Sequence, residues 1–82
     1  MGIINHVQLL ERLHSFILHK STGTPKQLAK KLNISVRSLY RIIEELRGHG
    51  VIITFDTARS SYIYENEVEF KLLLQIYDPG IE

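Results

Sequence analysis

The chain has 82 residues, of which 44% are hydrophobic and 23% are charged, and these values exclude a disordered or collagen-like protein. A chain of this length holds a single core, because smaller pieces would bury too little apolar surface to fold. It contains no cysteine, which excludes disulfide bonds, thiolate zinc sites and a cysteine nucleophile. No apolar run approaches the ~18 residues of a membrane span and no secretory signal begins the chain, so we expect a cytoplasmic protein.

The net charge of +1 conceals an uneven distribution along the chain. Residues 20–59 carry eight bases and three acids, which gives this segment a net charge of +5. Residues 60–82 carry one base and five acids, a net charge of −4. This division indicates that a polyanionic partner binds the middle of the chain and not its tail.

The first apolar pattern predicts a helix over residues 3–19. A second apolar line, formed by Leu9, Leu13 and Phe16, makes its apolar stripe wider than one buried face, so this helix should contact more than one neighbour. His14 lies within the stripe and is expected to be a buried or half-buried packing residue. The four histidines share no face and have no cysteine or paired carboxylate beside them, so no metal site is predicted.

Two shorter helices follow. Residues 24–27 (Thr-Pro-Lys-Gln) form a capping box with proline at the first helical position, and Asn33 is a plausible left-handed end of this helix. Ser35 is the N-cap of the next helix, expected over residues 36–47, and a Gly-His-Gly sequence at 48–50 ends it. This spacing predicts a helix-turn-helix.

The composition then changes to β-branched and aromatic residues. Residues 51–55 and 61–64 are predicted strands, and the polar segment 56–60 between them has the length of a hairpin loop. We therefore expect a β-hairpin after the third helix.

The last apolar stretch is ambiguous. Residues 68–76 alternate between apolar and mostly polar side chains, which favours a strand, although Asn66 followed by Glu69 resembles a capping box and an apolar spacing from Phe70 onwards also suits a helix. We favour the strand. One face of it would cover the first helix and the other would stay exposed, which predicts a homodimer. The residues expected at the dimer interface are Leu9, Phe16, Leu73 and Tyr77.

Residues 28–41 (Leu-Ala-Lys-Lys-Leu-Asn-Ile-Ser-Val-Arg-Ser-Leu-Tyr-Arg) and the Ile-Glu-Glu-Leu at 43–46 resemble the helix-turn-helix of bacterial winged-helix regulators. The nearest types are the DeoR-like, WYL-regulator and biotin-repressor DNA-binding domains. The resemblance implies an α+β fold in which residues 1–65 form a three-helix winged helix-turn-helix with a β-hairpin wing. Residues 66–82 would add an extra C-terminal strand. The chain has no room for the ligand-sensing domain of these relatives, so neither a small-molecule effector nor a cofactor is expected.

A rotation of about 100° per residue places Arg37 and Arg41 opposite the apolar face of the helix 36–47. An outward arginine can bind guanine or phosphate, and the N-terminal half of a recognition helix enters the major groove. We therefore expect a small transcriptional regulator that binds double-stranded DNA sequence-specifically, with the loop 56–60 on the backbone or in the minor groove. The predicted DNA-binding residues are Thr24, Lys26, Lys30, Ser35, Arg37, Ser38, Tyr40, Arg41 and Arg59.

Simpler roles remain for these residues. Arg41 and Glu45 have the spacing of an exposed helix ion pair, and Tyr40 could pack against the wing instead of DNA. The rival hypothesis for the whole chain is a winged-helix protein-interaction module, or a subunit of a larger complex, without DNA binding. The acids cluster in the tail and the serines are caps or turn residues, so an enzyme is not expected.

Overall fold

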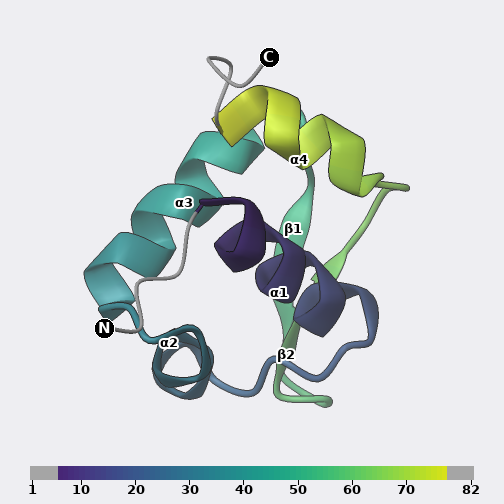
Figure 1. The fold of residues 1–82 in the computed structure, drawn as a ribbon. Coiled ribbons are helices and arrows are strands. Elements are labelled where there is room, and N and C mark those ends of the chain that lie inside the picture. The colour runs from purple at the N-terminus through teal and green to yellow at the C-terminus, as the bar shows by residue number, and fades with distance from the viewer. Residues whose placement is uncertain (1–5, 78–82) are drawn as a thin grey trace.

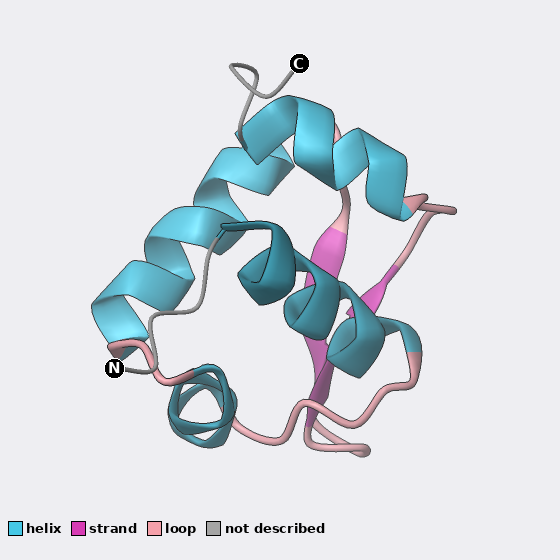
Figure 2. Cartoon of the chain, viewed as in Figure 1, coloured by secondary structure: helices cyan, strands magenta, loops and turns pink. Residues whose placement is uncertain are grey.

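The structure is a computed structural model that describes residues 6–77. The predicted α+β class is confirmed: three helices come first, and an antiparallel hairpin follows the third (Figures 1 and 2). Residues 3–5, which the apolar pattern also assigned to the first helix, lie outside the described residues. The elements in chain order are α1 (His6–Leu18), α2 (Pro25–Leu32), α3 (Val36–Gly48), β1 (Ile53–Asp56), β2 (Ser61–Tyr64) and α4 (Phe70–Tyr77).

Helix α1 lies at the centre of the molecule. It contacts α2, β2 and α4, and it crosses in front of the hairpin in Figure 2, with α4 above it and α2 below. This arrangement explains why its apolar stripe is wider than a single buried face. Helix α3 packs against α2 at one end and α4 at the other.

The predicted helix ends are confirmed by their hydrogen bonds. The Thr24 hydroxyl accepts the Gln27 backbone N–H at 3.2 Å, and the Gln27 side chain accepts the Thr24 N–H at 2.9 Å, which completes the capping box. Asn33 ends α2 in the left-handed conformation, with φ of 60°. Ser35 caps α3 by accepting the Ser38 N–H at 3.0 Å. Local sequence thus sets the tight turn between α2 and α3.

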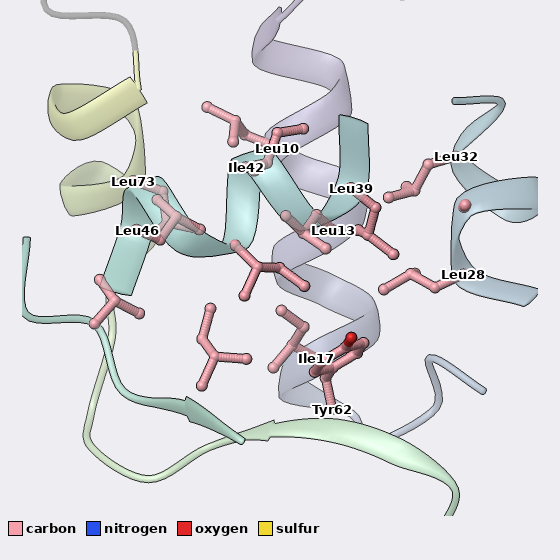
Figure 3. Packing of buried hydrophobic residues seen from close by; sticks show 14 of the residues in the cluster. Leu10, Leu13, Ile17, Leu28, Leu32, Leu39, Ile42, Leu46, Tyr62 and Leu73 are labelled. Atoms are coloured by element: carbon pink, nitrogen blue, oxygen red, sulfur yellow. The ribbon is translucent and has the colours of Figure 1, made fainter. Parts of the chain in front are cut away.

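All four helices and the hairpin contribute to one apolar core (Figure 3). Leu10, Leu13 and Ile17 of α1 point toward side chains of α2, α3 and the hairpin in Figure 3. Burying an aliphatic side chain of this size contributes about 2 kcal/mol. The helix-turn-helix is therefore joined to α1, α4 and the hairpin through one shared core. The fully or nearly fully buried apolar residues are Leu10, Leu13, Ile17, Leu28, Ala29, Leu32, Leu39, Ile42, Ile43, Leu46, Val51, Ile53, Tyr62, Leu73 and Ile76.

The hairpin is fastened to the loop between α1 and α2 by two buried polar side chains, Thr22 and Ser61. The Ser61 hydroxyl accepts the Thr22 N–H at 3.0 Å, and the Thr22 hydroxyl accepts the Tyr62 N–H at 2.8 Å. Each hydroxyl also donates to a backbone carbonyl, so neither oxygen is buried without a partner. This reciprocal link fixes the hairpin relative to the helix-turn-helix.

A second fastening joins the hairpin to α3. The Arg47 guanidinium donates from Nε and Nη2 to the Ile53 carbonyl, at 3.0 and 2.8 Å. The Asn66 side chain accepts the Ile52 N–H and donates to the Gly50 carbonyl, each at 3.2 Å. Asn66 therefore holds the segment after β2 against the connection between α3 and β1. It is not the N-cap of α4, which begins at Phe70.

The predicted C-terminal strand is wrong, because residues 70–77 form helix α4. Leu73 and Ile76, three residues apart, are buried in the core, as helical spacing requires, while Leu72 between them and the start of the helix is exposed. A strand would have put Leu72 on the same face as Ile76. The helix wins because it packs against α1 and α3 together and extends the same core.

This correction also removes one residue from the predicted dimer interface. Leu73 is 0% exposed and belongs to the monomer core, so it cannot form the outward apolar face that an alternating strand predicted. Leu9 and Phe16 are half-buried and pack against the core. The side chain of Tyr77 lies outside the described residues.

Candidate nucleic-acid interface

The exposed face of α3 carries two arginines with free guanidinium groups. Arg37 and Arg41 are exposed, lie one helical turn apart in the N-terminal half of α3, and have no hydrogen bond or ion pair within residues 6–77. The predicted pair between Arg41 and Glu45 is not formed. Glu44 instead binds Arg47, at 2.7 Å, so it does not neutralise Arg41.

The serines at the start of α3 are already engaged with each other. Besides accepting the Ser38 N–H, the Ser35 hydroxyl lies 3.0 Å from the Ser38 hydroxyl. Ser35 is exposed, whereas Ser38 is half-buried. Of the two, Ser35 is thus the more accessible to a phosphate group at the helix N-terminus.

The lysines of α2 divide into two groups. Lys26 and Lys30 are exposed, share one face at a spacing of four residues, and have no partner among the described residues. Lys31 donates to the Ser21 carbonyl at 3.0 Å, and its ammonium lies 5.2 Å from the centre of the Phe16 ring. Lys31 therefore fastens α2 to α1 and the loop before α2, and Lys26 and Lys30 remain for an external anion.

Tyr40 lies on α3 and is 48% exposed. Burial raises the pKa of the neighbouring Tyr62, Tyr40 adds to the rise, and the positive charge of Arg47 opposes it. The exposure of Tyr40 leaves its side chain accessible to solvent. A partly exposed side chain is compatible with both predicted roles of Tyr40, contact with DNA and packing against the hairpin.

The hairpin loop is short, and an aspartate organises it. One carboxylate oxygen of Asp56 accepts the backbone N–H groups of Ala58 and Arg59, at 3.0 and 3.3 Å. The other accepts from the Arg59 guanidinium at 3.3 Å. Arg59 is the one base of this loop, and its side chain is 54% exposed. Its positive charge is thus partly offset before any ligand binds.

The exposed, unpaired bases of α2 and α3 and the hairpin beside them form the geometry of a winged helix-turn-helix. The sequence matches a family described as an HTH domain over residues 8–62, more than half of the chain. The chain belongs to this family of helix-turn-helix DNA-binding domains. Comparison with curated proteins and with solved structures gives no match.

The helix-turn-helix domain also contains positioning residues that the sequence analysis missed. Thr22, Arg47 and Asn66 hold the hairpin and the segments that flank it in position relative to α2 and α3. Their partners lie between 6 and 40 residues away along the chain, so no local pattern could reveal them. The sequence offered one indication: Arg47 lies close to the apolar face that the helical spacing predicted, so its side chain was expected to point less directly into solvent than those of Arg37 and Arg41.

Other kinds of site receive no support from the described residues. No group of three or more histidines, aspartates and glutamates in residues 6–77 has the geometry to hold a metal ion. None of the helices in that range has the length and apolar character needed to cross a bilayer. His14 is confirmed as a half-buried packing residue, because its Nδ1 shares a 2.8 Å hydrogen bond with the Tyr64 hydroxyl and its ring contacts Phe70.

Proposed function

We propose that this protein is a small transcriptional regulator of the cytoplasm that recognises a specific sequence in double-stranded DNA. Helix α3 enters the major groove with Arg37 and Arg41 toward the bases or phosphates. Lys26 and Lys30 of α2 contact the DNA backbone, and Arg59 reaches the backbone or the minor groove. The observation that carries the proposal is that Arg37 and Arg41 are exposed, and unpaired among the described residues, on the second helix of a helix-turn-helix domain.

Titration of a labelled mixed-sequence duplex, followed by fluorescence anisotropy at several salt concentrations, tests this proposal. Binding is expected to weaken steeply with salt, because each phosphate contact releases counterions. If both arginines contact phosphates, Arg37→Gln/Arg41→Gln should lower the slope of log K against log salt by about 1.8. If they contact bases, the variant should instead lose preference for the selected site, by about 1–3 kcal/mol for each contact.

A matched control removes two charges elsewhere. Lys20 and Lys71 are exposed and unpaired within the described part of the chain, and they lie outside α2, α3 and the hairpin loop. Lys20→Gln/Lys71→Gln should therefore leave most of the affinity in place. Equal losses in the two double variants would mean that only net charge matters, which contradicts an interface on α3. No binding even at low salt would favour the alternative of a protein-interaction module.

The proposal includes a homodimer formed through α1 and α4. Val7 on α1 and Leu72 on α4 are exposed apolar side chains, 36% and 38% exposed, on two helices that contact each other. A twofold dimer would present two α3 helices to a palindromic site. Sedimentation at micromolar concentration should show a dimer that Leu72→Lys weakens. A strictly monomeric protein that stays soluble under these conditions would refute this part of the proposal.

A further inference from the structure

An open hollow lies between the end of α1 and the segment that joins β2 to α4. Its volume is roughly 420 Å³, within the range of small binding sites. Its walls include Leu18 at the end of α1, Lys20 just after it, Tyr64 at the end of β2, and Glu67, Val68 and Glu69 from the joining segment. We call it the acidic hollow. None of its residues belongs to α2, α3 or the hairpin loop, so the proposed DNA interface does not account for it.

The floor of the acidic hollow is apolar. Leu18 is 54% exposed, the highest value among the exposed large hydrophobic residues of the described chain. Val68 and Tyr64 beside it are half-buried and pack against the core from the other wall. An apolar side chain inserted here would cover Leu18 and remove that surface from water, which is how an anchor residue contributes to binding.

The rim is negatively charged. Glu67 and Glu69 are exposed, and their carboxylates have neither a hydrogen bond nor an ion pair within residues 6–77, whereas Lys20 is the one base in the lining. Glu65, directly before this segment, adds a third carboxylate, which accepts a hydrogen bond from the Thr54 hydroxyl at 2.9 Å. The excess of acids repels nucleic acid and attracts a basic ligand.

The acidic hollow faces away from the helix-turn-helix. In Figure 1, α3 and α2 occupy the left and lower left of the molecule, and the segment between β2 and α4 projects on the right. A ligand in the hollow would therefore not compete with DNA on α3. Residues 60–82, which carry the net charge of −4, supply the acidic wall.

We propose that the acidic hollow binds a basic peptide segment of a partner protein, which inserts an apolar side chain against Leu18 and Val68. Lysine or arginine side chains flanking this anchor pair with Glu67 and Glu69. The combination of an apolar floor with free carboxylates selects such a segment, because a purely basic peptide would leave Leu18 uncovered and a purely apolar one would leave the carboxylates unpaired. The domain can thus hold a protein partner while its opposite face meets DNA. This proposal does not depend on DNA binding.

Nuclear magnetic resonance titration of the whole ¹⁵N-labelled chain tests it, with the synthetic peptide Gly-Lys-Leu-Arg-Lys-Leu-Gly as the probe. Saturable shifts are expected at Leu18, Lys20 and residues 66–69, and no comparable shifts at Arg37 and Arg41. Replacing the leucines of the peptide by serine, or its bases by glutamate, should abolish them. A peptide that binds elsewhere, or does not bind at millimolar concentration, would overturn the proposal.

Two variants identify the contribution of the hollow. Glu67→Gln/Glu69→Gln should weaken the peptide roughly fivefold, since exposed ion pairs contribute modestly, and Leu18→Ser should weaken it by a similar factor. Glu11→Gln/Glu45→Gln removes the same charge from exposed positions outside the hollow and should leave the affinity unchanged. Equal losses in the two charge variants would refute the site. If the same resonances shift when the protein is diluted without peptide, a second copy of the chain occupies the hollow, and the proposal of a peptide ligand is refuted.

DNA affinity is measured on the same variants. Glu67→Gln/Glu69→Gln is expected to bind duplex DNA at least as well as the unaltered chain, because the hollow is remote from α2 and α3. If this variant loses peptide binding and keeps DNA binding, the peptide site and the DNA interface are independent of each other. If Arg37→Gln/Arg41→Gln loses DNA binding but keeps the peptide, the acidic hollow stands independently of the recognition helix.

Discussion

Ser35 is the residue where folding and the proposed function meet. Its hydroxyl satisfies the Ser38 N–H at the first turn of α3, and its exposure places it where a phosphate group would approach the helix N-terminus. The two roles can be separated, because asparagine and aspartate also cap helices well, and only aspartate adds a negative charge.

Three substitutions at Ser35 give distinct expected results. Ser35→Ala should lower the free energy of unfolding in urea by about 1 kcal/mol, through loss of the cap. Ser35→Asn and Ser35→Asp should retain most of the stability. DNA affinity should fall for Ser35→Asp relative to Ser35→Asn, because the carboxylate repels phosphate. Equal DNA affinity of these two variants would show that the start of α3 does not approach the DNA backbone.

The residue type does not show whether a basic side chain already has a partner within the fold. Arg37, Arg41 and Arg47 lie on one helix, yet Arg47 donates to the Ile53 carbonyl while the other two have no side-chain partner within residues 6–77. Lys31 similarly donates to loop carbonyls, whereas the side chain of Lys30 next to it has no partner in the described part of the chain. Spacing on the helix predicted the outward direction of Arg37 and Arg41. Only the tertiary structure showed that other bases, Arg47 and Lys31, already donate hydrogen bonds to backbone carbonyls.

At the scale of the element, α4 shows that an alternating pattern can arise on a helix. Apolar residues fill so many positions of residues 68–77 that both a period of two and a helical period fit. The outcome was decided by the space that α1 and α3 leave between them, which a helix fills with Leu73 and Ile76. Neither neighbour could be placed from the local sequence.

Two leucines of α4 provide a direct test of its orientation. Leu73→Ala should reduce the free energy of unfolding by about 2–5 kcal/mol, because it removes a completely buried side chain. Leu72→Ala should change it by less than about 0.5 kcal/mol at a protein concentration low enough to keep the chain monomeric, since Leu72 is exposed in the monomer. Chemical denaturation followed by circular dichroism measures both. The opposite order of the two effects would contradict the helix and support the strand.

At the scale of the whole molecule, three elements meet at His14. This residue of α1 bonds the Tyr64 hydroxyl of β2 and contacts Phe70 of α4, with ring centres 5.4 and 5.9 Å away. Burial lowers the pKa of His14 from its ordinary value of 6.5, and burial raises the pKa of Tyr64, which keeps the phenol protonated. The surroundings of His14 thus favour the neutral form of its imidazole ring.

The stability of the fold should therefore depend on pH. A lowered pKa means that the unfolded chain binds the proton more readily, so stability is fully present above pH 6.5 and decreases as the pH falls below it. The urea midpoint of the unaltered chain should fall on acidification below that value, and His14→Gln should reduce this dependence. His19→Gln, at an exposed position, should retain it. An unchanged pH profile in His14→Gln would contradict the assignment.

The sequence by itself determined the elements that depend on neighbours a few residues away. The capping box of α2, the left-handed Asn33, the Ser35 cap and the outward direction of Arg37 and Arg41 all follow from local backbone chemistry and helical spacing. The division of charge between residues 20–59 and 60–82 was also visible in the sequence.

Only the tertiary structure decided which groups were free to act. It made residues 70–77 a helix, committed Arg47 and Lys31 to backbone carbonyls, joined Thr22 to Ser61 across 39 residues, and gave the acidic tail an apolar hollow beside Leu18. The reason is physical: caps and helix faces are satisfied by residues one turn away, whereas core space and the partners of long side chains come from segments that meet only when the whole chain packs.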